Sequence, residues 1–180
     1  MNEIEQLILY FEHAVTKIED LDFESIACAT NILRGARTDE RRVWLAGNGG
    51  SAATASHFSN DLRKMCHIDA TSLPNDISTI LAYGNDEGWE NMFSGAMEPF
   101  NAGDVLIAIS CSGASMNVIR AAWKAERRGG YIIALTGPVT KKNQLMLLAH
   151  PAIVVNSLDI KVQEDLHLMI CHSIAGVLAI

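Results

Sequence analysis

The sequence has few cysteines, and they form no recognisable motif. The four, Cys28, Cys66, Cys111 and Cys171, are widely spaced and make no CxxC pair, which argues against the disulfide framework of a small secreted domain. No basic and apolar signal segment opens the chain. We therefore expect reduced thiols and a cytoplasmic protein.

Long apolar runs and positive charge are also scarce. No apolar run approaches the ~18 residues that a membrane-spanning helix needs. The chain has 14 Lys and Arg against 21 Asp and Glu, a formal net charge of -7, so its overall field repels nucleic acid and acidic membrane surfaces. We expect no membrane association and no direct nucleic-acid binding.

Repeats, low-complexity segments and linkers are absent too, and 180 residues of which 49% are hydrophobic fit one globular domain spanning 1–180. Short apolar runs rich in β-branched residues alternate with helical patterns. Because these runs lack polar alternation, they indicate a parallel sheet covered on both faces. The prediction is an α/β three-layer sandwich, flavodoxin-like, with an N-terminal helical extension over about residues 1–36. Strands are predicted at 43–46, 104–109, 131–136 and 152–155, and helices at 4–18, 23–33, 51–64, 75–81, 87–99, 115–128 and 159–180.

Both ends of the chain carry apolar residues that need a covering surface. The first helix is amphipathic, with apolar residues three and four apart from Ile4 to Ile18, and residues 174–180 are apolar apart from a glycine. These features predict a homo-oligomer built around a helical bundle.

Two predicted strands end in similar loops of small and polar residues. Gly47-Asn48-Gly49-Gly50-Ser51 follows the first strand, and Ser110-Cys111-Ser112-Gly113-Ala114-Ser115 follows the second. Bare backbone and serine hydroxyls suit an anion held beyond the carboxyl ends of parallel strands. Taken singly, each loop could equally be a tight turn followed by a helix N-cap, with Ser51 and Ser115 as the capping residues.

The spacing in these loops argues against a nucleotide. Neither loop has the lysine of a Walker A motif, and neither shows the GxGxxG pattern of a dinucleotide site. A compact phosphorylated ligand is the better fit, with no nucleotide cofactor.

Candidate acid and base groups lie on two predicted helices. His57 and Asp61 are four residues apart and share a face, as do Glu164 and His172, which are eight apart. Such groups could move protons in an aldose–ketose conversion. On spacing alone, His57 could equally be a helix histidine bonded to a neighbour, and His167 is interpreted as structural.

These residues occur in motifs that resemble a known family. "GNGGSA", "SHFSNDL", "GND", "SCSGAS" and "ALTG" follow one another in the order found in the sugar isomerase (SIS) domain, and within it in the phosphoheptose isomerases. The resemblance spans nearly the whole chain. It implies that Ser110, Ser112 and Ser115 cradle a sugar phosphate and that Asp86 contacts sugar hydroxyls. The first loop would contribute the residues Asn48, Gly49, Gly50 and Ser51.

The resemblance also implies an active site that holds Zn²⁺ in some members, formed by a His and a Glu four apart and by a Gln and a His eight apart. His57 and His172 match the two histidines, but Asp61 stands where the family has Glu. Glu164 stands at the Gln position if His172 sets the register; Gln163 is the alternative match but lies nine residues from His172 and turns away from its face. The two histidines and two carboxylates, His57, Asp61, Glu164 and His172, would still suit a Zn²⁺ site. A carboxylate displaced by about an ångström can cost ~100-fold in rate. Cys111 is interpreted as a small filler.

The resemblance therefore implies an enzyme that converts sedoheptulose 7-phosphate to D-glycero-D-manno-heptose 7-phosphate through an enediol, in heptose synthesis for surface polysaccharide. It also implies a homotetramer whose sites draw on more than one subunit. Two alternatives stay open: a non-catalytic SIS protein that binds a sugar phosphate or associates with a replication initiator, motivated by the changed residues at 61 and 164, and an isomerase of another phosphosugar.

Overall fold

A computed structural model describes residues 2–138 and 143–179. Its sheet has five parallel strands in the order β2-β1-β3-β4-β5. They are β1 (Val43–Gly47), β2 (Ala70–Ser72), β3 (Val105–Ser110), β4 (Tyr131–Thr136) and β5 (Ala152–Val154). This is the flavodoxin-like order: the chain goes from β1 to β2 on one side, then crosses back to β3 on the other side of β1 and continues to β4 and β5. The predicted α/β sandwich with a central parallel sheet is confirmed.

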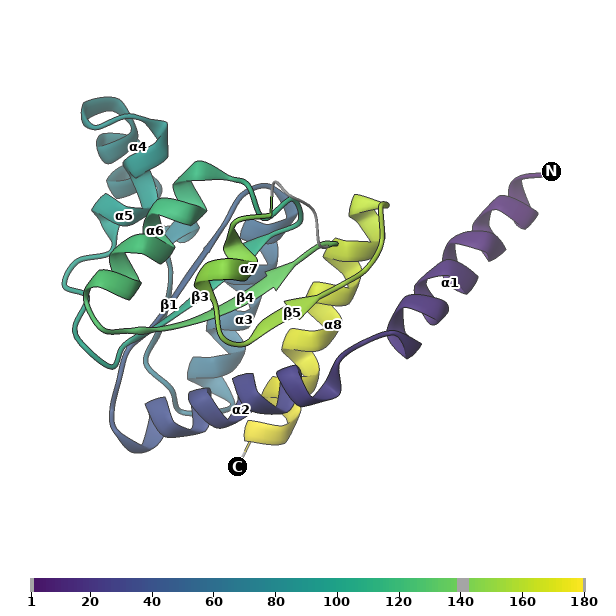
Figure 1. Ribbon diagram of the computed structural model, residues 1–180, viewed down its shortest axis with the longest axis horizontal. Coiled ribbons are helices and arrows are strands. Elements are labelled where there is room, and N and C mark those ends of the chain that lie inside the picture. The colour runs from purple at the N-terminus through teal and green to yellow at the C-terminus, as the bar shows by residue number, and fades with distance from the viewer. Residues whose placement is uncertain (1, 139–142, 180) are drawn as a thin grey trace.

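Helices cover both faces of the sheet (Figure 1). α2 (Phe23–Thr38), α3 (Gly50–Lys64) and α8 (Ile160–Leu178) pack on one face. The other face carries α5 (Met92–Ala96), α6 (Met116–Arg127), α7 (Leu145–Leu148) and the 3₁₀ turn η1 (Leu73–Asn75). α4 (Ile77–Asp86) and the 3₁₀ turn η2 (Trp89–Asn91) complete this second layer.

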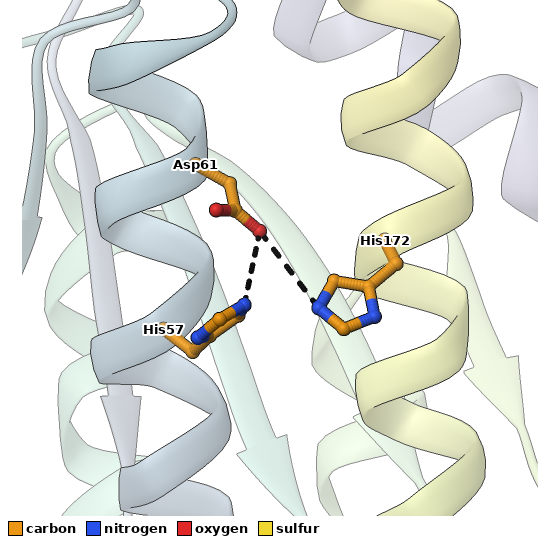
Figure 2. Close-up of side chains that lie close together, drawn as sticks. All are labelled: His57, Asp61 and His172. Carbon is orange, nitrogen blue, oxygen red and sulfur yellow. Dashed lines mark ion pairs between the residues drawn. The ribbon is translucent and has the colours of Figure 1, made fainter.

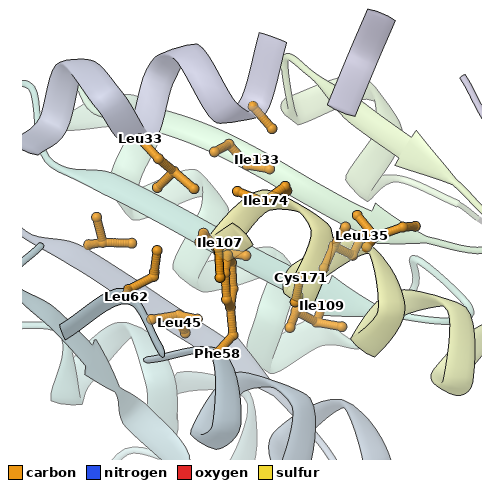
Figure 3. Close-up of a cluster of buried hydrophobic side chains, with 14 of the residues drawn as sticks. Leu33, Leu45, Phe58, Leu62, Ile107, Ile109, Ile133, Leu135, Cys171 and Ile174 are labelled. Carbon is orange, nitrogen blue, oxygen red and sulfur yellow. The ribbon is translucent and has the colours of Figure 1, made fainter. Parts of the chain in front are cut away.

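Strand residues alternate between two hydrophobic cores, one on each face of the sheet. Leu45 and Ile107 point into the first core, whereas Trp44 and Leu106 point into the second. Figure 3 shows the first core, where Phe58 of α3 reaches between the strands and α8. This packing fixes α3 and α8 side by side on the sheet, which decides where their polar faces meet.

The N-terminal helix α1 (Glu3–Glu19) extends away from the sheet (Figure 1). A capping box between Asn2 and Glu5 starts it, and the Tyr10 hydroxyl, 2.5 Å from Asp165 Oδ2, ties it to α8. None of its residues is buried. Several large apolar side chains on it are exposed: Ile4, Leu7, Ile8, Leu9, Phe11 and Val15.

The structure corrects several predicted boundaries. Gly84-Asn85-Asp86 falls between the helices predicted at 75–81 and 87–99, but it forms the last turn of α4. Tyr83 of that helix packs against Gly95, where a Cβ would lie 2.2 Å from the ring. The helix predicted over 87–99 is instead η2 followed by the short α5. β2 and α7 were not predicted, and the N-cap of α3 is Gly49, not Ser51.

Among the described residues, no helix is both long enough and apolar enough to span a bilayer.

The buried His167 gives the fold a predicted acid sensitivity. Burial lowers the pKa of His167 to about 4, while its Nε2 lies 3.3 Å from the Thr136 carbonyl oxygen. Its contribution to stability is present above the unfolded pKa of about 6.5. It is lost as the pH falls towards 4, because the unfolded chain then binds a proton that the native state does not, at a cost of about 3 kcal/mol.

We expect His167→Gln to show a shallower fall in the free energy of unfolding between pH 6.5 and 4 than the parent chain, measured by urea unfolding. The exposed His150 is the control, and His150→Gln should leave the slope unchanged. Equal slopes for all three proteins would contradict the assignment.

Candidate active site

The first loop leaves β1 and enters α3 through three glycines. A Cβ at Gly47 would lie 2.7 Å from the backbone oxygen of Ser51, so the strand and the helix approach more closely than a side chain allows. Gly49 has a φ of 54° and no side-chain cap, a conformation that glycine adopts at little cost. The N-terminus of α3 therefore has no side-chain cap, and a helix N-terminus of this kind favours an anion.

The second loop, after β3, places three serine hydroxyls together. Ser110 Oγ lies 3.2 Å from Ser115 Oγ and 3.5 Å from Ser112 Oγ, and Ser112 Oγ accepts a hydrogen bond from the Ala114 amide. Gly47 of β1 is paired in register with Ile109 of β3. Because β1 and β3 are neighbours, the two loops meet where the strand order reverses, the usual ligand position in such sheets.

A buried polar brace holds the second loop in shape. Asn143 donates to Thr136 Oγ1 at 3.1 Å, and Thr136 Oγ1 donates to the Ser110 carbonyl at 2.8 Å. Gly113 has a φ of 61°, and a Cβ there would lie 1.8 Å from Asn143 Oδ1. The loop therefore depends on a bare backbone at 113 and on the amide at 143.

A polar contact joins the first loop to the start of α6, the helix that follows the second loop. Asn48 and Asn117 exchange hydrogen bonds between their side-chain amides, at 3.0 and 2.8 Å. Asn117 is fully buried in the first turn of α6. It was not singled out from the sequence, although a polar residue among the buried Val118, Ile119 and Ala121 is the signal that could have found it.

These loops enclose a cavity of about 190 Å³. Predicted phosphate-binding residues line it, together with Cys111, Ile109 and Ile160 and the carboxylate-bearing Glu164 of α8. The predicted residues among the lining are Asn48, Ser51, Ser110, Ser112, Ser115 and Glu164. Burial and the charge of Glu164 raise the pKa of the Cys111 thiol, which suits the predicted filler role. A larger hollow of about 610 Å³ beside α2 contains none of the predicted site residues.

A second polar cluster lies further along α3 and α8. Asp61 Oδ2 is 3.4 Å from His57 Nε2 and 3.9 Å from His172 Nε2 (Figure 2). The two imidazole rings stand edge to face, with their centroids 4.9 Å apart. Asp61 is nearly buried, with 12% of its side chain exposed, whereas both histidine side chains are about half exposed, at 51% and 50%. The carboxylate is thus fixed, and the imidazoles can reach a ligand.

This cluster has the composition and size of a zinc site. One ligand atom from each of His57, Asp61 and His172 lies within 4.8 Å of the others. Two imidazoles and a carboxylate are common Zn²⁺ ligands, and bonds of about 2.0–2.1 Å place neighbouring ligands of a tetrahedral ion ~3.4 Å apart. The three residues therefore fit the metal, whereas Glu164 is not in this group and lines the cavity instead.

The cavity and the cluster are separated along the helices by about the length of a sugar chain. Ser51 and His57 are six residues apart on α3, or ~9 Å at the helical rise of 1.5 Å per residue. At roughly 1.2 Å per bond, the seven bonds from C2 to phosphorus in an extended heptulose 7-phosphate span about 8 Å. This span is comparable to the rise along the α3 axis between Ser51 and His57.

Three other residues considered from the sequence lie away from the cavity. Asp86 is exposed at the end of α4, where it accepts a hydrogen bond from Asn85. Gln163 is buried and donates to the Ser157 carbonyl at 2.7 Å, and His167 is buried against β4. The structure therefore presents Glu164, not Gln163, towards the cavity.

Comparison with known proteins identifies the class of protein to which this chain belongs. The SIS domain family model matches residues 8–137. A phosphoheptose isomerase from Sulfurimonas denitrificans is 35% identical over 182 residues, covering 98% of this chain and 88% of the relative. One from Nitratiruptor is 35% identical over 185 residues, covering 99% and 97%.

Solved structures agree with the sequence relatives. A phosphoheptose isomerase from Neisseria gonorrhoeae superposes with a TM-score of 0.89 at 27% identity, with 98% of each chain covered. One from Francisella tularensis gives 0.90 at 27% identity, covering 99% of this chain and 98% of the other. The chain belongs to the SIS domain family. Within it, it belongs with the phosphoheptose isomerases.

Proposed function

We propose that the chain is an aldose–ketose isomerase that converts sedoheptulose 7-phosphate to D-glycero-D-manno-heptose 7-phosphate, supplying heptose for surface polysaccharide. The single observation that carries the proposal is that α3 and α8 carry both a wall of the serine-lined cavity and an Asp flanked by two His, with His57 about 9 Å along α3 from Ser51. Relatives named phosphoheptose isomerase support it across the whole chain.

The chemistry needs one group to take a proton from C1 and another to protonate the C2 carbonyl oxygen. The C1–H electron pair becomes the C1=C2 bond of the enediol as the C2 carbonyl oxygen takes a proton. The O1 proton then leaves, its electron pair forms C1=O, and the C1=C2 pair takes a proton at C2, which yields the aldose. Asp61, His57 and His172 are the groups placed to move these protons. The serine loop would hold the phosphate, and the hydroxyls of the sugar would point towards the two helices.

A bound Zn²⁺ belongs to the same proposal, held by His57, Asp61 and His172. It would polarise the carbonyl and hydroxyl oxygens of the substrate as a Lewis acid. Titrating the metal-free chain with Zn²⁺ alone should show one site per chain. We expect Asp61→Asn and His57→Ala to weaken it at least tenfold and the exposed control His150→Ala to leave it unchanged. Equal affinities in all four proteins would exclude this cluster as the site.

We also propose that the working enzyme is a homotetramer located in the cytoplasm. The exposed apolar face of α1, hollowed around Ile8, Phe11 and Val15, supports assembly. The half-exposed histidines leave room for a neighbouring subunit at the site. The free cysteines support the cytoplasmic location. We propose no nucleotide cofactor, because neither the loop after β1 nor the loop after β3 carries a nucleotide-binding pattern.

Replacing apolar residues of α1 with charges should dissociate the assembly. We expect Leu7→Glu combined with Phe11→Glu to shift the mass measured by light scattering from tetramer towards monomer. Gln6→Glu adds the same charge at an exposed position of the same helix outside this hollow, and it should leave the mass unchanged. A parent protein that is already monomeric, or a double variant that stays tetrameric, would contradict the proposal.

A binding protein without turnover is the alternative of a different class. The shorter carboxylate at Asp61 favours it, because that side chain is held between the imidazoles and does not extend into the cavity. Turnover of sedoheptulose 7-phosphate by the purified chain decides between the two. An isomerase of another phosphosugar would show turnover with a ketose phosphate of different length.

A further inference from the structure

Glu164 is a carboxylate in a cavity otherwise built for an anion. Among the described residues that line the cavity, it is the one charged side chain, and it shares the lining with four serines and Asn48. A phosphate bound by the serine loop therefore has a negative charge within the same space of about 190 Å³. This arrangement weakens phosphate binding unless the carboxylate gains something from the rest of the ligand.

The carboxylate lies against the start of α3. A Cβ at Gly50 would be 2.3 Å from Glu164 Cδ and 2.4 Å from each of its carboxylate oxygens. The N-cap of α3, Gly49, provides no side-chain bond to the first turn. Glu164 thus takes the position that an anion favours at a helix N-terminus, and leaves the serine loop before α6 for the ligand.

The influence of Glu164 extends across the cavity. Its charge contributes to the raised pKa of the Cys111 thiol, which lies inside the serine loop. The carboxylate and the loop therefore interact electrostatically.

We propose that Glu164 determines the specificity of the cavity: it disfavours bare phosphate and pyrophosphate and favours the phosphate ester of a polyol. This inference rests on the proposed function, because it assumes that the serine loop binds phosphate. A sugar phosphate carries hydroxyl groups beside its phosphate, and these donate hydrogen bonds to the carboxylate. Orthophosphate offers fewer donors and pyrophosphate offers more negative charge, so neither compensates for the repulsion.

The test measures binding, not turnover, by calorimetric titration of the full chain with orthophosphate, pyrophosphate and sedoheptulose 7-phosphate. Glu164→Gln keeps the shape and removes the charge. We expect it to bind orthophosphate about five- to tenfold more tightly, pyrophosphate by a larger factor, and the sugar phosphate with a smaller gain. Selectivity for the sugar phosphate over orthophosphate should therefore fall.

Two variants control for other effects. Glu164→Asp keeps the charge and should change orthophosphate affinity less than twofold. Glu126→Gln makes the same chemical change on the exposed surface of α6 and should leave all three affinities unchanged. Because selectivity is a ratio within one protein preparation, partial unfolding of a variant does not alter it.

An orthophosphate affinity that is unchanged or weaker in Glu164→Gln overturns the inference. If the parent chain turns over sedoheptulose 7-phosphate in that case, only this inference fails. If the parent chain binds none of the three ligands, the serine loop is not an anion site, and both this inference and the proposed function fail.

Discussion

Replacing His172 with Ala should lower kcat for sedoheptulose 7-phosphate by two to four orders of magnitude, the range in which a positioned acid or base contributes. His57→Ala should have an effect of the same size. In the structure both imidazoles face Asp61 Oδ2, at 3.4 and 3.9 Å. Removing either one takes away a group that can move a proton and leaves the carboxylate with a single partner.

The same variants should keep their ligand affinity. The histidine side chains are about half exposed, so their loss creates no buried cavity and costs little stability. The serine loop does not contact them, and we expect sedoheptulose 7-phosphate to stabilise each variant thermally to within a few degrees of the parent. His150→Ala, exposed and remote, serves as the control for both measurements.

A retained rate in His57→Ala or His172→Ala, within tenfold of the parent, would contradict the assignment of this cluster. A loss of binding together with the rate would indicate that the histidines hold the ligand and do not carry out the chemistry.

Gly113→Ala should weaken sugar phosphate binding by about 10- to 100-fold. The residue has a φ of 61°, where a side chain is strained, and the added Cβ would lie 1.8 Å from Asn143 Oδ1. To relieve that contact, Asn143 must leave Thr136, or the serine loop must shift. Either change moves the hydroxyls of Ser110 and Ser112 from the positions that enclose the cavity.

A double-variant cycle separates these two causes. In Asn143→Ala the brace is lost but the space at 113 opens, so adding Gly113→Ala should cost much less than it does in the parent. The measurement is the Kd for sedoheptulose 7-phosphate in all four proteins. Equal costs in both backgrounds would show that backbone strain alone, and not the contact with Asn143, governs the loop.

The sequence predicted those parts of the site that depend on residue types and spacing within one loop or one helix. The glycines at 47, 49 and 50 and the serines from 110 to 115 predicted two anion loops, and the structure places them side by side because β1 and β3 are neighbours. The pairing of His57 with Asp61 followed from helical spacing. The third residue of this cluster, His172, joins the other two only because α8 packs beside α3, and the shared core around Phe58 establishes that packing.

Features that depend on contacts between distant segments could not be predicted from the sequence alone. β2 is three residues long and reads Ala-Thr-Ser, so its place in the sheet comes from pairing with β1 and not from a hydrophobic pattern. Asn143 gives no local signal, because its role depends on a glycine thirty residues earlier. Helical periodicity places Gln163 on a different face of α8 from His172. The structure shows why Gln163 points inward: its side-chain amide donates to the Ser157 carbonyl, and Glu164 is the residue that lines the cavity.

The most direct test of the central claim is ¹H NMR of the purified chain with sedoheptulose 7-phosphate in D₂O, with Zn²⁺ supplied. The account predicts an aldose 7-phosphate that carries deuterium at C2, because an acid group that has exchanged with D₂O protonates the enediol there, with formation slowed at least a hundredfold in His172→Ala. If the ketose phosphate binds but neither exchanges a proton nor forms an aldose at high protein concentration, the chain is a sugar phosphate binding protein, and the assignment of Asp61, His57 and His172 to catalysis is wrong.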